Sequence, residues 1–240
     1  MLWSGGKDST ASIILAHEYS EPLDEIIFTE VMYDNRRGIS GENSVHMEFI
    51  RKVAMPLFFS WGYQVTILRG ERDYLSFFNH VIEKPTKNMD HKGKCFGFPC
   101  GKLCGIRRDC KQRPIKEYLS HYAKEEIVTY LGICADEKKR LFSMHKAKEK
   151  VSLLEKYGIT QKEAGDLCLK YGLLSPAYQY SKRGGCWFCP FAKEKEQAMI
   201  KDSMPDIWEE FVSLEERNDV ANKKWNPYLG TLRQRDLEIS

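Results

Sequence analysis

The sequence predicts an α/β protein in which a parallel, twisted sheet carries helices on both faces. Segments rich in apolar and β-branched residues, typical of buried strands, alternate with segments of helical period; the strand segments are 25–33, 63–68 and 126–133. This alternation favours parallel pairing, because each helix then serves as the crossover between two strands. No linker rich in Gly, Ser or Pro divides the chain. We therefore expect one domain over residues 1–240, with a basic, cysteine-rich segment at 84–116 and a cysteine knuckle with a helical extension at 183–240.

The individual elements follow from local patterns. Met1–Trp3 is a short strand that leads through a glycine-rich turn into a helix at 11–18. Apolar residues recur at the helical period over 42–61, and Pro56 is expected to kink this helix. Thr160 with Glu163 three residues later forms a capping box, which marks the start of another helix. The other predicted elements are helices at 73–82 and 114–124, an irregular or strand-like segment at 173–180, and helices in the last fifty residues with the apolar stripe Trp208, Phe211 and Leu214.

The composition indicates a soluble globular protein. Hydrophobic residues make up 42% of the chain and charged residues 30%, which allows a core and argues against a membrane protein. No apolar run is long enough to span a bilayer and the first residues are not a secretion signal, so we expect a cytoplasmic location without membrane contact. In such a chain, eight clustered cysteines favour metal binding or redox chemistry over disulfides. Cys168 lies on a periodic apolar face and is expected in the core.

Positive charge is concentrated in one segment. Residues 84–116 contain ten Lys and Arg against two Asp, a net charge of +8, whereas the whole chain carries only +3. A basic surface on an otherwise mildly acidic chain indicates an anionic partner or substrate, with a solvated loop as the plainer interpretation.

The segment SGGKDST at 4–10 is the strongest local sign of a ligand site. Its two glycines let the backbone approach an anion closely, and the helix that follows offers unpaired N–H groups. Lys7 adds a positive charge, the hydroxyl groups are further donors, and Asp8 is suited to hold a metal ion or to orient the loop. The spacing does not match the Walker A loop.

Four segments, taken together, resemble the ATP pyrophosphatase (PP-loop) superfamily and its phosphoadenosine phosphosulfate reductase-like branch. They are SGGKDS at 4–9, Cys110-Lys111-x-x-Pro114-Ile115, LGICADEKKR at 131–140, and Gly185-Cys186-x-x-Cys189-Pro190. The resemblance implies an adenine nucleotide α-hydrolase-like fold that binds ATP, or another adenylyl nucleotide, with Mg²⁺. The nucleotide-binding residues that it implies are Ser4, Gly5, Gly6, Lys7, Asp8 and Ser9 of the loop, and Asp34 after the second predicted strand.

The resemblance also implies an enzyme that cleaves ATP between its α and β phosphates. The expected chemistry is adenylyl transfer coupled to sulfur insertion or reduction, with tRNA or DNA modification as one setting. A nucleic acid or a sulfur-donor protein is the expected partner. The expected catalytic residues are Lys7, Asp8 and Arg140, and those expected to bind an anionic substrate are Lys111, Arg113, Asp136 and Arg140. The carboxyl ends of parallel strands open on one edge, so one cleft could collect these groups. The alternative for Arg140 is an ion pair with Asp136 on one helix.

The chain departs from the family pattern at two places. Sulfonucleotide reductases carry a catalytic cysteine in a C-terminal motif, whereas the tail RQRDLEIS has none, and Cys134 stands where the pattern has an arginine. Two other functions therefore stay open. One is a sulfonucleotide reductase that uses an atypical cysteine, and the other is a nucleic-acid-binding zinc protein with a degenerate nucleotide loop.

The pair Cys186-x-x-Cys189 predicts a metal site, because two intervening residues let both thiolates reach one metal ion or cluster. Trp187 and Phe188 would shield it. The resemblance favours Cys104 and Cys110 as the other two ligands, of either a [4Fe–4S] cluster or zinc. Alternative ligands are Cys95, Cys100 and Cys134.

Overall fold

Two hydrophobic cores organise the chain, one in each of two units. The computed structural model describes residues 1–99, 104–122, 127–179, 181, 185–226 and 230–239. The first unit comprises Met1–Thr29, Ser44–Leu68 and Ile115–Gly184, and the second comprises Glu30–Asn43, Arg69–Pro114 and Gly185–Ser240. The second unit thus contains most of the basic segment and, from Gly185 onward, the C-terminal segment. None of the helices in the described ranges is long and apolar enough to cross a membrane.

A three-stranded sheet lies in the first unit, in the order β1-β2-β5. Its strands are β1 (Leu2–Trp3), β2 (Glu25–Glu30) and β5 (Gln64–Arg69). β1 runs parallel to β2, with Trp3 opposite Phe28. Both side chains are buried, and Phe58 packs edge-on against Trp3.

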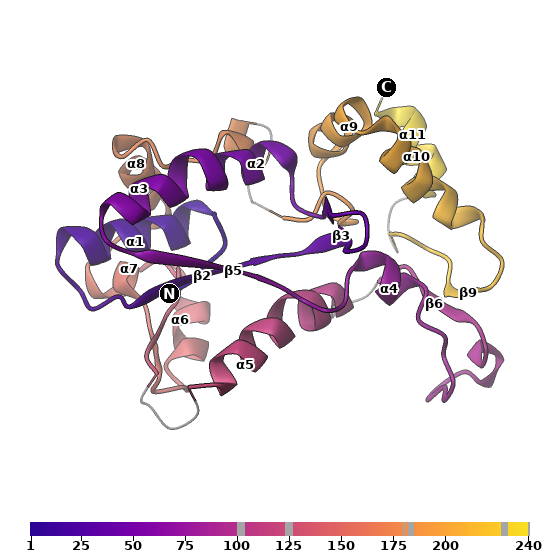
Figure 1. Ribbon diagram of the computed structural model, residues 1–240, viewed down its shortest axis with the longest axis horizontal. Coiled ribbons are helices and arrows are strands. Elements are labelled where there is room, and N and C mark those ends of the chain that lie inside the picture. Colours follow the sequence, from indigo (N-terminus) through magenta and orange to yellow (C-terminus); the bar gives the residue numbers. More distant parts are fainter. Residues whose placement is uncertain (100–103, 123–126, 180, 182–184, 227–229, 240) are drawn as a thin grey trace. The chain divides into compact units, whose positions relative to one another are not determined.

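Helices cover both sides of β2 and β5 (Figure 1). On one side are α2 (Ser44–Phe49) and α3 (Met55–Ser60), and on the other is α5 (Arg113–Ser120). A π-helical turn, Ile50–Ala54, separates α2 from α3, and Pro56 follows in the first turn of α3. Near Pro56, where we expected a kink, the helix thus changes to a π-helical turn, which accommodates the N–H that proline lacks.

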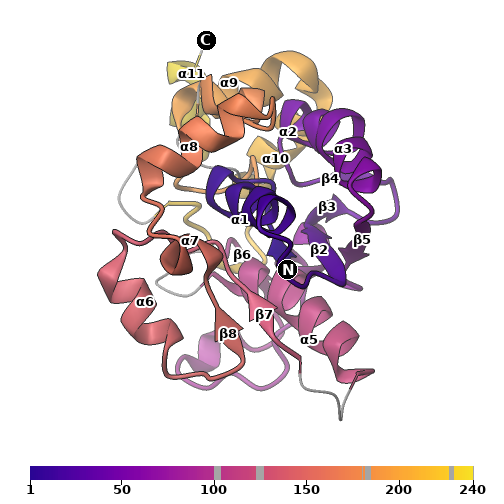
Figure 2. The ribbon, with the colours of Figure 1, turned by 90° about the vertical axis from the view of Figure 1, so that its left-hand side faces the viewer.

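The remaining helices of the first unit surround the start of the chain. Figure 2 shows α1 (Lys7–Glu18) beside α8 (Gln161–Lys170), and α1 also contacts α7 (Leu153–Lys156). The capping box of Thr160 and Glu163 at the start of α8 is confirmed. α1 begins at Lys7 rather than at Ala11, so half of the SGGKDST segment forms the first turn of the helix.

The predicted strand at 126–133 is wrong in length and placement. Only β7 (Thr129–Tyr130) is a strand, and it pairs in parallel with β8 (Lys150–Val151) in a separate two-stranded sheet. β8 leads into α7, and α6 (Lys138–Met144) lies between β7 and β8 in sequence. The chain leaves the strand conformation after Tyr130 because residues 132–134 pack against α1, as described below.

The second predicted strand, 25–33, is divided. β2 ends at Glu30, and the next residues form β3 (Met32–Asp34), which pairs antiparallel with β4 (Ile39–Ser40). The predicted helix 73–82 is shorter than expected: α4 (Tyr74–Phe78) starts at a capping box of Asp73 and Ser76. Its chain then turns back, with Val81 bridged to Cys95.

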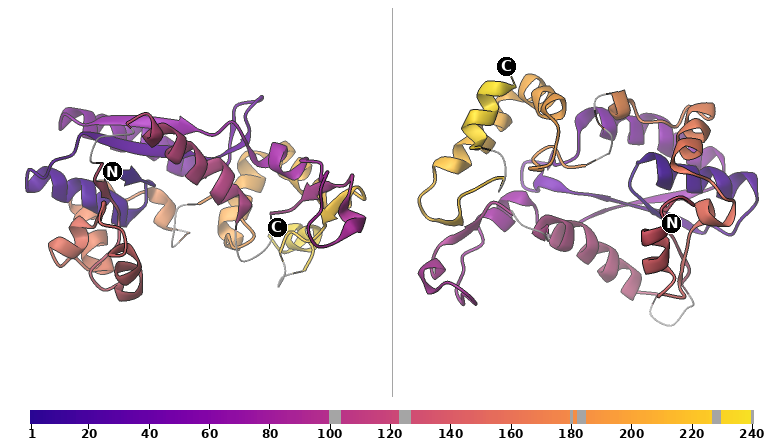
Figure 3. Two further views of the ribbon diagram at one scale, coloured as in Figure 1. Left: turned by 90° about the horizontal axis from the view of Figure 1, so that it is seen from below. Right: turned by 180° about the vertical axis from the view of Figure 1, so that it is seen from behind.

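Aromatic residues fill the core of the second unit. Trp208 and Phe211 of the predicted stripe are buried there, together with Trp187 and Trp225, whereas Leu214 is only partly buried. The C-terminal helices are α9 (Glu194–Ser203), α10 (Pro205–Ser213) and α11 (Leu232–Glu238), drawn in orange to yellow in Figure 3. The extension is not entirely helical: β9 (Val220–Asn222) pairs in parallel with β6 (Cys95–Gly97).

Candidate functional site

The turn between β1 and α1 requires a glycine at position 5. Gly5 has a φ of +72°, a conformation that residues with side chains rarely adopt. A Cβ atom there would also lie 2.5 Å from Nε2 of His46. His46 is buried, with Nδ1 2.8 Å from Ser175 Oγ and Nε2 3.3 Å from the Ser4 carbonyl oxygen. Because a carbonyl oxygen only accepts, Nε2 carries a proton. His46, which the sequence analysis did not single out, thus packs against Gly5 and the Ser4 carbonyl and supports the loop.

The two serines of the loop bind its own backbone. Ser4 N–H donates to Ser9 Oγ at 3.2 Å, and Ser9 Oγ donates to the Gly6 carbonyl at 3.0 Å. Ser4 Oγ accepts from Gly6 N–H at 3.3 Å. These bonds hold the turn in shape, and the N–H of Asp8 donates to no acceptor in the described part of the chain.

Lys7 and Asp8 form an ion pair at the first turn of α1. The ammonium group of Lys7 also donates to the Gln161 carbonyl at 2.8 Å. The backbone N–H of Lys7 donates to the hydroxyl of Tyr178 at 2.9 Å. Tyr178 lies in a 3₁₀ turn, Pro176–Gln179, where the sequence predicts an irregular segment and gives no sign of a functional residue.

Residues 131–140, another of the segments that carry the resemblance, pack directly against the first turn of α1. A Cβ atom on Gly132 would lie 2.5 Å from the backbone nitrogen of Ser9, so only glycine allows this approach. The approach brings donor atoms of Asp8, Cys134 and Glu137 within 4.8 Å of one another. Cys134 is fully buried, and its N–H donates to Glu137 Oε2 at 2.9 Å. Burial, together with the Asp8 carboxylate that accepts a hydrogen bond from the thiol, raises the pKa of Cys134.

Asp136 and Arg140 form polar contacts near the group of Asp8, Cys134 and Glu137, but not with each other as the alternative prediction has it. Asp136 Oδ1 accepts from the N–H of Gln161 at 3.2 Å, and Arg140 pairs with Glu137 at 2.6 Å. The alternative pair of Asp136 with Arg140 is therefore wrong. Lys7 and Asp136 both contact Gln161, and Arg140 contacts the glutamate beside Asp8, so four of the predicted site residues in the first unit form one connected set.

Asp34, the remaining predicted nucleotide ligand, belongs to the second unit and binds within its own turn. Its carboxylate accepts from the N–H groups of Arg36 and Arg37 at 2.8 and 3.2 Å and pairs with the Arg37 guanidinium. Arg37 in turn pairs with Glu210 of α10 at 2.6 Å.

The four predicted metal ligands, Cys104, Cys110, Cys186 and Cys189, all belong to the second unit, and each is a free thiol. Burial raises the pKa of Cys186, and the charges of Glu42, Cys189 and Cys104 add to the shift, whereas Lys111 opposes it. Burial likewise raises the pKa of Cys110 to about 12, with Cys104 among the contributing groups. Cys186 thus lies within electrostatic range of Cys189, Cys104 and Lys111. Among the described residues, however, no three of the four predicted ligands have their sulfur atoms within 4.8 Å of one another.

Backbone contacts hold the cysteine knuckle. Cys186 bridges antiparallel to Glu42, and Trp187 N–H donates to the Gly41 carbonyl at 2.9 Å. Trp187 and Phe188 are 1% and 3% exposed, and both rings pack in the core of the second unit. Arg113 lies at the start of α5, within electrostatic range of Asp109.

The other cysteines have other surroundings. Cys95 accepts a hydrogen bond from Arg217 at 3.3 Å and donates to Asp219. Cys134 belongs to the Asp8–Glu137 group, and Cys168 is buried in the core as predicted, where its thiol donates to the Lys7 carbonyl at 3.2 Å. Cys100 lies outside the described residues.

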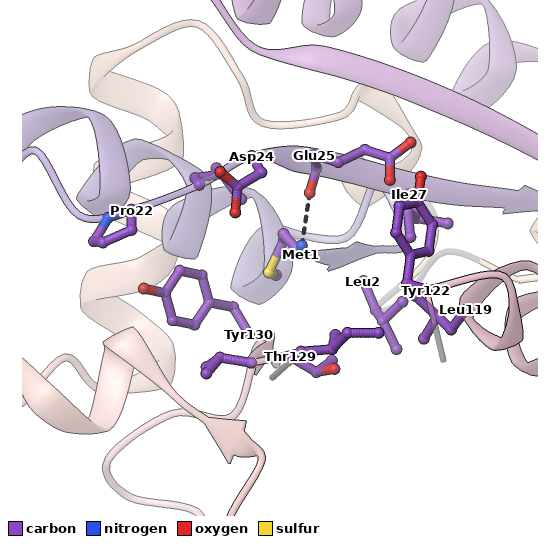
Figure 4. A pocket seen from close by; sticks show the side chains of 13 residues that line it. Met1, Leu2, Pro22, Asp24, Glu25, Ile27, Leu119, Tyr122, Thr129 and Tyr130 are labelled. Carbon is purple, nitrogen blue, oxygen red and sulfur yellow. Dashed lines mark hydrogen bonds between the residues drawn. The ribbon is translucent and has the colours of Figure 1, made fainter. Parts of the chain in front are cut away.

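A cavity of about 240 Å³ lies at the start of β1 and is lined by Met1, Tyr122 and Tyr130, among others (Figure 4). The amino group of Met1 donates to the Glu25 carbonyl there at 2.7 Å. The cavity is at the opposite end of β1 from Ser4. Ligands of parallel sheets bind beyond the carboxyl ends of the strands, so we assign no nucleotide to this cavity.

Comparison with known proteins yields one distant relative. The uncharacterized protein MJ0973 of Methanocaldococcus jannaschii is 23% identical over 230 residues. The aligned region covers 90% of this chain and 47% of that protein, so the chain spans about half the length of this relative. No family model matches the chain, and no solved structure matches it.

Proposed function

We propose that this chain is an ATP-using enzyme of the PP-loop superfamily, in its phosphoadenosine phosphosulfate reductase-like branch, with an adenine nucleotide α-hydrolase-like fold. The close approach of Gly132 to Ser9 carries the proposal. It joins two sequence landmarks more than 120 residues apart into one group of charged side chains at the start of α1. An anion bound at this helix start would meet the N–H of Asp8 and the ammonium group of Lys7.

The proposed reaction is adenylyl transfer. The bond between the α phosphorus and the bridging oxygen breaks, an oxygen atom of the substrate bonds to the α phosphorus, and pyrophosphate leaves with the electron pair. Lys7 supplies positive charge to the phosphates. Asp8 and Glu137 offer the carboxylate oxygens that Mg²⁺ prefers, and a bound Mg²⁺ would neutralise charge on the triphosphate. The thiol of Cys134 donates a hydrogen bond to the Asp8 carboxylate and so helps to orient it.

We assign the metal of the second unit to Cys104, Cys110, Cys186 and Cys189. Four free sulfur donors suit either zinc or a [4Fe–4S] cluster, and a bound cation would favour the thiolate form that burial opposes. A cluster would supply electron transfer for sulfur chemistry, whereas zinc would stabilise the knuckle. Lys111 offsets part of the negative charge of the thiolates.

Pyrophosphate release from ATP tests the proposed function. Asp8→Ala should abolish release while the protein stays folded, and Asp166→Ala, at an exposed carboxylate of α8, should leave release unchanged. Unchanged release in folded Asp8→Ala protein would refute the assignment of catalysis to this loop. Sulfite release from a sulfonucleotide, without pyrophosphate release from ATP, would favour the reductase alternative instead.

A further inference from the structure

A second pocket, entirely within the second unit, gathers positive charge. Its volume is about 750 Å³. The cationic and histidine side chains that line it are Arg72, His80, Lys84, Lys87, His91 and Arg108, and the acidic one is Glu83. We call this the basic pocket. With neutral histidines its lining carries a net charge of +3.

The fold fixes the loop that supplies most of these charges. Val81 bridges to Cys95, Ile82 N–H donates to the Lys94 carbonyl at 2.9 Å, and Gly93 N–H donates back to the Ile82 carbonyl at 2.9 Å. The loop between them is therefore closed at its base. Phe77 and Phe96, in edge-to-face contact at 4.8 Å between ring centres, form an apolar part of the lining.

Among the described residues, the charge of the basic pocket is neutralised only in part. Arg72 and Arg108 share one carboxylate, that of Asp109, at 3.4 and 2.6 Å. Lys84 and Lys87 form no ion pair with any residue in the described parts of the chain. Elsewhere in this unit Arg233 and Arg235 each contact more than one carboxylate. The surplus positive charge is thus local to the pocket.

We propose that the basic pocket binds single-stranded nucleic acid, as the substrate of the adenylyl transfer. In that role the inference rests on the proposed function, but as a binding site it depends on the second unit alone. Lysines on an exposed loop suit the regularly spaced phosphates of a strand, and Phe96 with Asn88 and Asn222 offers apolar and amide contacts for a base. A pocket of this size admits an unpaired base. The bases of a duplex are stacked within the double helix and so cannot enter the pocket. Lys92 and Arg107, exposed and outside the lining, continue the positive charge along the same segment.

Fluorescence anisotropy with labelled twelve-nucleotide RNA and single-stranded DNA, without ATP, tests the proposal. Affinity should fall with salt, because phosphate contacts release counterions with a slope of about −0.7 per contact for single strands. The double variant Lys84→Ala, Lys87→Ala should weaken binding about fivefold or more and, because two phosphate contacts are lost, reduce the slope by about 1.4. The control is Lys193→Ala with Lys195→Ala, two exposed lysines of the same unit outside the pocket, which should bind as the unchanged protein does.

Three outcomes would overturn the proposal: equal weakening in both double variants, no binding of either strand, or competition by adenosine monophosphate as effective as by the oligonucleotide. The last would make the pocket a mononucleotide site. Strand binding by a protein that releases no pyrophosphate from ATP would instead refute the proposed function and leave the binding site in place.

Discussion

The backbone N–H of Lys7 donates to the phenolic oxygen of Tyr178 at 2.9 Å, although 171 residues separate them in sequence. This N–H is the first of helix α1, a position whose N–H groups have no partner inside the helix. The tyrosine therefore holds a donor that a phosphate group bound at the helix start would use.

Tyr178→Phe should lower stability and raise affinity for nucleotide. Loss of the hydrogen bond should cost about 0.5–1.5 kcal/mol of unfolding free energy. A phosphate would no longer compete with the hydroxyl, so we expect ATP or inorganic pyrophosphate to bind about two- to tenfold more tightly. Thermal unfolding and calorimetric titration measure the two effects. If the variant binds more weakly, the hydroxyl assists the ligand and does not compete with it.

Gly132→Ala should disrupt the loop at 4–10. The added Cβ atom would lie 2.5 Å from a backbone nitrogen, so either residues 131–134 or the first turn of α1 must shift. We expect a loss of about 2 kcal/mol or more of unfolding free energy and loss of pyrophosphate release.

The matched control is Gly165→Ala, inside helix α8, where the Cβ atom would make an ordinary 3.8 Å contact with Lys7. Because alanine favours helix over glycine, this variant should be more stable by up to about 1 kcal/mol. Equal stability of the two variants in chemical denaturation would show that residues 131–134 do not pack tightly on α1.

Arg140→Ala should weaken binding of an anionic substrate and leave the melting temperature almost unchanged. Its side chain is 57% exposed and pairs with Glu137 three residues earlier, an arrangement that contributes only about 0.2–1 kcal/mol. We expect a higher KM with little change in unfolding temperature. Lys139→Ala removes a neighbouring exposed charge and should change neither quantity; a KM that is the same in both variants and in the unchanged protein would leave Arg140 without a role in binding.

Cys186→Ser should remove the metal. Protein purified without oxygen should contain either zinc or iron with sulfide, and the variant should lose it by elemental analysis. Cys95→Ser should keep the metal, because Cys95 is bound to Arg217 and Asp219. Removing the metal should also speed alkylation of Cys104, which is an exposed residue. Full metal content in Cys186→Ser would show that Cys186 is not a ligand and that the metal binds at other residues.

Features set by near neighbours in sequence were predictable. The capping box of Thr160 and Glu163, the interruption at Pro56 and the buried stripe of Trp208 and Phe211 were all expected and are present. The loop at 4–10 was also expected between a strand and a helix, because two glycines and a row of hydroxyl groups suit only a few local structures. The sequence by itself thus determined the mixed α/β class, the type of most elements and the residues around which a site is built.

Only the tertiary structure decided which distant residues meet. β7 pairs with β8 and not with the sheet of β1, and β9 forms a strand against β6 where a helical pattern was expected. The group of Asp8, Cys134 and Glu137, the support of Gly5 by His46 and the contact of Tyr178 with Lys7 depend on how loops close and surfaces pack. Local preference does not encode such contacts, because their free energy comes from burial and hydrogen bonding between segments that the chain brings together only when it folds.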